Sequence, residues 1–223
     1  MVKSIRVGVI ASGGGTDLQS IIDASEKGKI AASVVVVISD NESAYALERA
    51  RKHKIPAVFL NPKNLNRISY DKQLNEECEK YNLDLIVGAG YMRILSDFFV
   101  EQWFGKLINI HPALLPSFKG VNGQDQAFNY GVKLAGCTTH FIDNEMDHGP
   151  IILQAALKVL SSDSKESLKQ RILDVEHQIL PRTIQLFAEK RLKIEGRIVS
   201  IKTSDSWLES YPVIPDVLYS DGY

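Results

Sequence analysis

The sequence has little cysteine and no cysteine cluster. Cys78 and Cys137 are the two cysteines of the 223 residues, they are far apart, and no further cysteine stands beside either. This pattern argues against a disulfide framework and against a cysteine-based zinc site. We therefore expect both cysteines to be small packed residues, and we expect no bound metal.

Long apolar runs and an excess of one charge are also missing. The purest apolar run, Val34 to Ile38, is far shorter than the roughly 20 residues that cross a bilayer, and the N-terminus has no apolar signal core. The 26 basic and 27 acidic residues nearly balance, so no long-range field attracts nucleic acid or an anionic membrane. We expect a cytoplasmic protein that binds neither.

The first half of the chain alternates between apolar strands and helical patterns. Almost wholly apolar runs, typical of strands that are buried on both faces, lie at residues 5–10, 34–39, 85–89 and 107–110. Helical patterns lie between them at residues 16–24, 44–53 and 69–81, and a short strand is expected at 57–60. This alternation predicts an α/β fold with a doubly wound, mostly parallel sheet.

The pattern changes after His111. A loop rich in glycine and proline and a short helix at 124–130 precede two strands, 134–142 and 151–159, which are expected to form a C-terminal antiparallel hairpin. A long helix follows at about 164–189, with Ser164 as its cap and Pro181 as a kink or break. A strand near Ile198 and a loose tail complete the chain. We expect a single domain over residues 1–204 and a tail over 205–223.

Asn109 and His111 place an amide and an imidazole on an otherwise apolar strand. Being two residues apart, their side chains leave the same face of the strand and can converge on one atom. Pro112 lacks the N–H that a central strand needs, so the strand ends at His111, and ligands bind at the carboxyl ends of parallel strands. This favours a catalytic pair, although the two side chains could also satisfy turn backbone.

The first strand leads into three glycines, Gly13 to Gly15, followed by Thr16, Asp17 and a helix. Free N–H groups and the helix dipole at such a place favour a phosphate. The spacing fits neither the dinucleotide fingerprint nor a Walker loop, so a small phosphomonoester suits it better. The alternative is a tight turn in which Thr16 or Asp17 caps the helix.

The loop of the expected hairpin carries Asp143, Glu145 and Asp147 at alternate positions. A calcium-binding loop does not fit this spacing, because His148 occupies the position of the required glycine and no glutamate stands at the closing position of the loop. One carboxylate could instead orient an imidazole, and a solvated turn is the other interpretation. His140, which alternates with Phe141 in a strand, is expected to be a satisfied core histidine.

Four motifs together resemble the phosphoribosylglycinamide formyltransferase family, a group of folate-dependent formyltransferases. They are SGGGTDLQ at 12–19, MRILS at 92–96, NIHPALLP at 109–116 and DHGPIILQ at 147–154. The resemblance extends from about residue 5 to 190. It implies transfer of the formyl group of 10-formyltetrahydrofolate, as a co-substrate, to the amine of 5'-phosphoribosylglycinamide in purine (IMP) biosynthesis.

The resemblance also implies roles for individual residues. Asn109 is the amide that polarises the formyl carbonyl, His111 is the acid, and Asp147 holds the imidazole. The ribotide contacts are Gly15, Thr16, Asp17 and Glu176, in a phosphate half over about 1–105. The folate contacts are Asn109 together with Arg67, Met92, Arg93, Ile94 and Leu95, with the folate and catalytic half over about 106–190. From the residues alone, Arg93 beside apolar neighbours is also typical of a surface group.

Two positions depart from the family pattern. Gln124 stands where many relatives have a histidine, and Leu173 stands where some have a cation. Related alternatives are a methionyl-tRNA formyltransferase, a formyltetrahydrofolate hydrolase and an inactive sugar-phosphate-binding module. The partners expected are small molecules, and a homodimer is compatible with the sequence.

Overall fold

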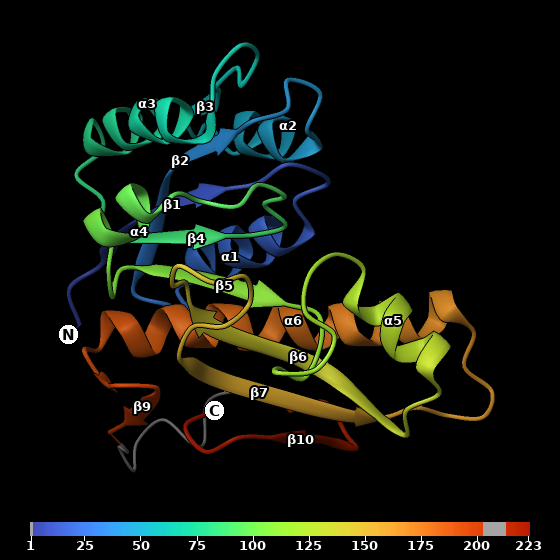
Figure 1. The fold of residues 1–223 in the computed structure, drawn as a ribbon. Coiled ribbons are helices and arrows are strands. Elements are labelled where there is room, and N and C mark those ends of the chain that lie inside the picture. Colours follow the sequence, from blue (N-terminus) through green and yellow to red (C-terminus); the bar gives the residue numbers. More distant parts are fainter. Residues whose placement is uncertain (1, 203–212) are drawn as a thin grey trace.

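The computed structural model describes residues 2–202 and 213–223, whose strands form one mixed sheet (Figure 1). The strand order is β3-β2-β1-β4-β5-β6-β7-β9-β8, and β10 pairs with β7. The strands are β1 (Ile5–Ile10), β2 (Ala32–Ser39), β3 (Ala57–Phe59), β4 (Leu85–Gly88), β5 (Leu107–His111), β6 (Leu134–Phe141), β7 (Ile151–Lys158), β8 (Leu192–Glu195), β9 (Ile198–Ile201) and β10 (Val217–Tyr219). The helices are α1 (Thr16–Glu26), α2 (Tyr45–Lys52), α3 (Arg67–Glu79), α4 (Asp97–Gln102), α5 (Gly123–Tyr130) and α6 (Lys165–Ala188).

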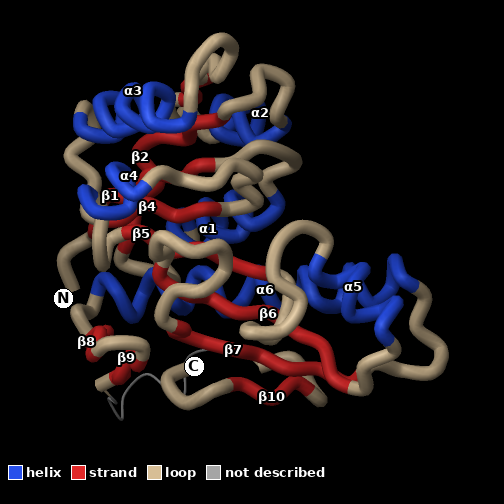
Figure 2. Tube along the Cα trace, in the orientation of Figure 1, coloured by secondary structure: helices blue, strands red, loops and turns tan. Residues whose placement is uncertain are grey.

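The first five strands pair in parallel, and helices cover both of their faces (Figure 2). Successive strand residues enter opposite cores: Leu85 and Val87 pack with α1, α2 and α6, whereas Ile86 packs with α3 and α4. Burial on both faces explains why these strands are apolar throughout. The predicted fold class is confirmed, including the parallel part of the sheet.

The second part of the sheet is antiparallel. Strand β6 pairs with β5 and β7 in antiparallel register, so the predicted hairpin is confirmed. One face of this hairpin packs on the apolar stripe of α6, where Ile172 and Ile179 are buried. Ser164 caps α6 as predicted, because its hydroxyl accepts a hydrogen bond from the Ser167 N–H at 3.1 Å.

Two expectations about the C-terminal part are wrong. The long helix expected at about 164–189 is present as α6, but of the two outcomes expected at Pro181, a kink or a break, the break is wrong, because α6 continues to Ala188. Proline removes one helical hydrogen bond, yet Ile179, Leu180 and Ile184 around it are fully buried, and this tertiary packing holds the helix together. The tail is not loose throughout, because β10 pairs with β7; residues 203–212 lie outside the described part. Helix α4 and strand β8 were not predicted.

Both cysteines are buried and free, as expected from their spacing. Burial raises the pKa of the Cys78 thiol to about 12, which keeps it protonated and unreactive. Within the described residues, no helix is both long and apolar enough to cross a membrane.

Candidate active site

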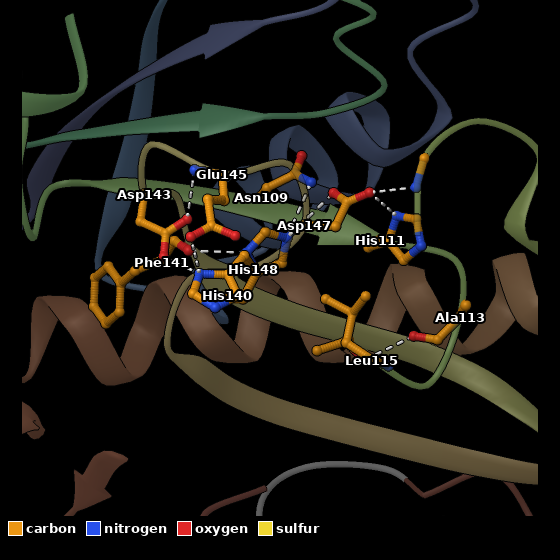
Figure 3. Close-up of polar contacts among 12 residues, drawn as sticks. Asn109, His111, Ala113, Leu115, His140, Phe141, Asp143, Glu145, Asp147 and His148 are labelled. Carbon is orange, nitrogen blue, oxygen red and sulfur yellow. Dashed lines mark hydrogen bonds and ion pairs between the residues drawn. The ribbon is translucent and has the colours of Figure 1, made fainter. Parts of the chain in front are cut away.

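Asn109 and His111 lie at the carboxyl end of β5, in the middle of the sheet. Across the antiparallel pairing with β6, Asn109 is opposite His140 and His111 is opposite Thr138. Figure 3 shows that Asp147, from the loop between β6 and β7, lies between the side chains of Asn109 and His111. The structure therefore brings the three predicted catalytic residues together, whereas their chemical roles stay predictions.

Asp147 is held in place through its Oδ2 atom, while its Oδ1 atom faces His140. Its Oδ2 atom accepts a hydrogen bond from the Gly120 N–H at 2.7 Å and lies 3.4 Å from Nδ1 of His111. Its Oδ1 atom lies 3.8 Å from Nε2 of His140. The side chain is 12% exposed, so little water screens this charge from the two imidazoles.

The contact made by Nε2, the second ring nitrogen of His111, shows that this atom carries a hydrogen. Nε2 lies 2.8 Å from the carbonyl oxygen of Phe118, which can only accept, so Nε2 carries a hydrogen. When Nδ1 is protonated as well, the resulting imidazolium faces the Asp147 carboxylate. This buried pair can supply a positive charge and a proton to an oxyanion that forms nearby.

His140 is the buried, satisfied histidine that the sequence predicts, but it also contacts the site. Its Nδ1 lies 2.8 Å from the Phe141 carbonyl oxygen and must donate to it, so Nε2 accepts from the Asn109 amide nitrogen at 3.2 Å. Burial lowers the pKa of His140, in agreement with a neutral ring. His140 thereby orients the Asn109 amide, and only the register of β5 with β6 could have revealed this from sequence.

The glycine turn before α1 has a geometry that requires glycine. Gly15 has a φ of 67°, and a Cβ placed on it would lie 2.8 Å from Cβ and 2.9 Å from Cα of Ala46. Gly15 is itself the N-cap, and no side chain caps the helix, so the interpretation of Thr16 or Asp17 as a cap is wrong. The first N–H groups of α1 are therefore available to an anion.

Asp17 and Glu176 form a buried pair of carboxyl groups beside this turn. Burial raises the pKa of Asp17 to about 7. Burial and the charge of Asp17 raise the pKa of Glu176 well above its ordinary value. The Oδ1 atom of Asp17 lies 3.8 Å from Nε2 of His177, and both atoms are buried without a hydrogen-bond partner in the described part of the chain. These polar atoms can meet the hydroxyl groups of a sugar.

A cavity of about 460 Å³ opens between α1 and α6. Its lining includes Thr16 and His177 but none of the residues around His111. The cavity therefore begins beside Thr16, at the start of α1, and does not reach the imidazole site.

The segment predicted to contact folate follows β4, next to the glycine turn. The Met92 N–H donates to the hydroxyl oxygen of Ser12 at 2.9 Å, which joins the two loops. Met92 and Ile94 are 69% and 56% exposed, whereas Leu95 is buried. These two exposed apolar side chains are available to contact an apolar ligand.

The two predicted folate arginines have different environments. The guanidinium of Arg93 lies 4.5 Å from the centre of the buried Tyr70 ring, so this half-buried side chain packs on a ring of its own chain. Arg67 is exposed at the first residue of α3. In this structure neither arginine is assembled with the imidazole site.

The remaining carboxylates of the hairpin loop serve the loop itself. Asp143 accepts a hydrogen bond from the Glu145 N–H at 3.1 Å and lies 2.8 Å from Nδ1 of His148. Among the described residues, no three histidine, cysteine or acidic side chains are grouped to hold a metal ion.

Comparison with known proteins identifies the class. Residues 5–184 match the formyl transferase family, so the chain belongs to this family, and the predicted resemblance is confirmed. Phosphoribosylglycinamide formyltransferase of Escherichia coli is 38% identical over 218 residues, which are 97% of this chain and 100% of that protein. A crystal structure of glycinamide ribonucleotide transformylase 1 from Symbiobacterium toebii shares 48% identity and a TM-score of 0.87, over 89% of this chain and 94% of that one. The trifunctional purine biosynthetic protein adenosine-3 of Bos taurus is 42% identical over 88% of this chain, which spans only 20% of that protein.

Proposed function

We propose that this protein transfers the formyl group of 10-formyltetrahydrofolate to the amine of phosphoribosylglycinamide, a step of purine biosynthesis. The convergence of Asn109, His111 and Asp147 carries the proposal, in a chain that aligns with all of the E. coli phosphoribosylglycinamide formyltransferase. Direct attack of an amine on a formyl carbon requires positioning, an oxyanion donor and proton transfer. This chain offers groups for each of these.

In the proposed reaction the ribotide amine attacks the formyl carbon and the carbonyl oxygen becomes an oxyanion. The amide nitrogen of Asn109 donates one hydrogen to His140 and directs its second hydrogen at this oxygen. His111 stabilises the oxyanion as an imidazolium opposite Asp147. Because Nε2 of His111 donates to Phe118 in the free protein, the substrate oxygen replaces this carbonyl as its acceptor.

The tetrahedral intermediate then collapses. The C–N bond to the folate nitrogen breaks, that nitrogen takes up a proton, and the attacking nitrogen loses one. The carbonyl re-forms on the ribotide, so that formyl-ribotide and tetrahydrofolate are the products. Asp147 keeps the imidazole oriented while His111 carries the proton.

The two substrates approach from neighbouring loops. The phosphate binds the N–H groups of Gly15, Thr16 and Asp17 at the start of α1, and Glu176 accepts hydrogen bonds from the ribose hydroxyls. The folate lies against residues 92–95, together with Arg67 and Asn109. A cytoplasmic location, a homodimer and the division into two halves stay predictions from the sequence.

One set of assays tests this function against its relatives. The purified protein would be given 10-formyltetrahydrofolate with phosphoribosylglycinamide, with water alone, or with methionyl-tRNA. We expect rapid formylation of the ribotide only. Formate release without an acceptor, formylation of the tRNA, or ribotide binding without turnover would each refute the proposal in favour of one alternative.

A further inference from the structure

We propose that Arg197, at the turn between β8 and β9, is a positioning residue that holds the Asp147 loop in register with His111. The residue lies outside the stretch 5–184 that matches the family. The inference rests on the proposed role of Asp147. It concerns the loop of residues 142–150, between β6 and β7.

The backbone of this loop needs support from outside. Asp147 has a φ of 48°, in the left-handed region that residues other than glycine seldom adopt. The carboxylate reaches Gly120 and His111 only while this conformation holds. At the end of the loop, a Cβ on Gly149 would lie 1.9 Å from the Phe141 carbonyl oxygen, so the chain is tightly closed there.

Arg197 contacts both the backbone and the ring of His148, the residue that follows Asp147. Its Nη2 donates to the His148 carbonyl oxygen at 2.6 Å, and its Nη1 lies 2.9 Å from Nε2 of the same histidine. The Asp143 carboxylate can only accept, so Nδ1, which lies 2.8 Å from it, carries a ring hydrogen. Nη1 also lies 3.2 Å from Nδ1, but a guanidinium can only donate, so its acceptor on the ring is Nε2.

The result is a chain of contacts from the β8–β9 hairpin into the loop of residues 142–150. Arg197 holds both the backbone and the ring of His148, the ring holds Asp143, and Asp143 accepts from the Glu145 N–H. Both ends of the loop are thus tied to one cation. Arginine suits this task because its planar fork reaches two acceptors at once, which an ammonium cannot do with the same geometry.

Strand pairing brings the cation to this place. Ile198, the residue after Arg197, pairs in parallel with Ile151, immediately after the loop. The turn between β8 and β9 therefore lies next to the end of the loop, within reach of the exposed Arg197 side chain.

The test compares Arg197→Ala and Arg197→Lys with Lys193→Ala, which removes an exposed cation from the same hairpin. We expect Arg197→Ala to lower kcat roughly tenfold, because Asp147 leaves its position more often, with little change in the KM of the ribotide. Arg197→Lys should recover part of the loss, and Lys193→Ala should match the wild type. An unchanged kcat in Arg197→Ala would overturn the proposal.

A second comparison separates positioning from general stability. If Arg197 acts through Asp147, Arg197→Ala should cause no further loss in an Asp147→Asn background. An equal loss in both backgrounds would refute the mechanism. Amide hydrogen exchange of residues 143–149 gives a readout without catalysis: we expect faster exchange in Arg197→Ala than in Lys193→Ala. Wild-type protein that fails to formylate the ribotide would refute the proposed function, and the exchange experiment would still decide whether Arg197 holds the loop.

Discussion

Replacing Gly15 with alanine should damage both the fold and the ribotide site, whereas the same change at Gly14 should do neither. A non-glycine residue in the left-handed conformation of Gly15 costs about 1–2 kcal/mol. The new Cβ would also lie 2.8–2.9 Å from Cβ and Cα of Ala46 in α2, and overpacking of this kind costs about 1–3 kcal/mol. The two effects together lower the free energy of unfolding by about 2–5 kcal/mol.

Gly14 is a matched control, because a Cβ there meets nothing within 4 Å and no positive φ is involved. Urea unfolding of both variants measures the stability, and steady-state kinetics at a temperature where both are folded measures the ribotide and folate KM values. We expect Gly15→Ala to raise the ribotide KM far more than the folate KM, since the turn contacts only one ligand. A urea midpoint for Gly15→Ala equal to that of Gly14→Ala would refute the reasoning about the turn. Equal changes in both KM values would refute the assignment of the phosphate.

Three further predictions concern charge and proton transfer. His111→Ala and Asp147→Asn should each lower kcat by about 10²- to 10⁴-fold, as the loss of an acid catalyst does, and near-normal turnover in either variant would contradict the proposed catalytic set. Gln124→Ala should keep kcat within about tenfold of the wild type across pH, because an amide cannot donate a proton near neutral pH; a loss as large as that of His111→Ala in a folded, substrate-binding variant would show that the set is incomplete. Because burial raises the pKa of Asp17 from 3.8 to about 7, the folded state binds more protons than the unfolded state between these values, and stability should fall as pH rises through this window. Asp17→Asn should make this decline smaller without abolishing it, because burial also raises the pKa of Glu176, and the variant should gain up to about 4 kcal/mol over the wild type at pH 8, measured by urea unfolding at pH 5 and pH 8. Parallel pH profiles of the two proteins would show that Asp17 is not buried as a carboxylate.

The architecture follows from patterns that a single sequence displays. Strands with apolar residues at every position can only be buried on both faces, which predicts the parallel sheet. The spacing of Asn109 and His111, with Pro112 after them, correctly places both side chains at one strand end. The three residues meet as the family motifs imply, although no pattern within the sequence alone specifies the distance to Asp147.

Other features depend on packing between distant segments and leave no local signal. Pro181 is a helix breaker by propensity, and only the buried residues around it explain why α6 continues. Asn109 and His140 are joined by the register of β5 with β6, which a sequence does not state. Arg197 reads as an ordinary surface cation until the pairing of Ile198 with Ile151 places it beside the loop.

Helix α6 underlies both parts of the sheet and carries Glu176 to the glycine turn at the other end of the chain. A fragment that ends before α6 would have the proposed phosphate turn but neither the proposed ribose contact nor the helix that covers α1. The proposed ribotide site is therefore complete only after α6 has been synthesised and has docked. A ribotide bound there would bridge the two ends of the sequence, and its binding free energy would oppose unfolding of the whole sheet rather than of the half that holds the phosphate.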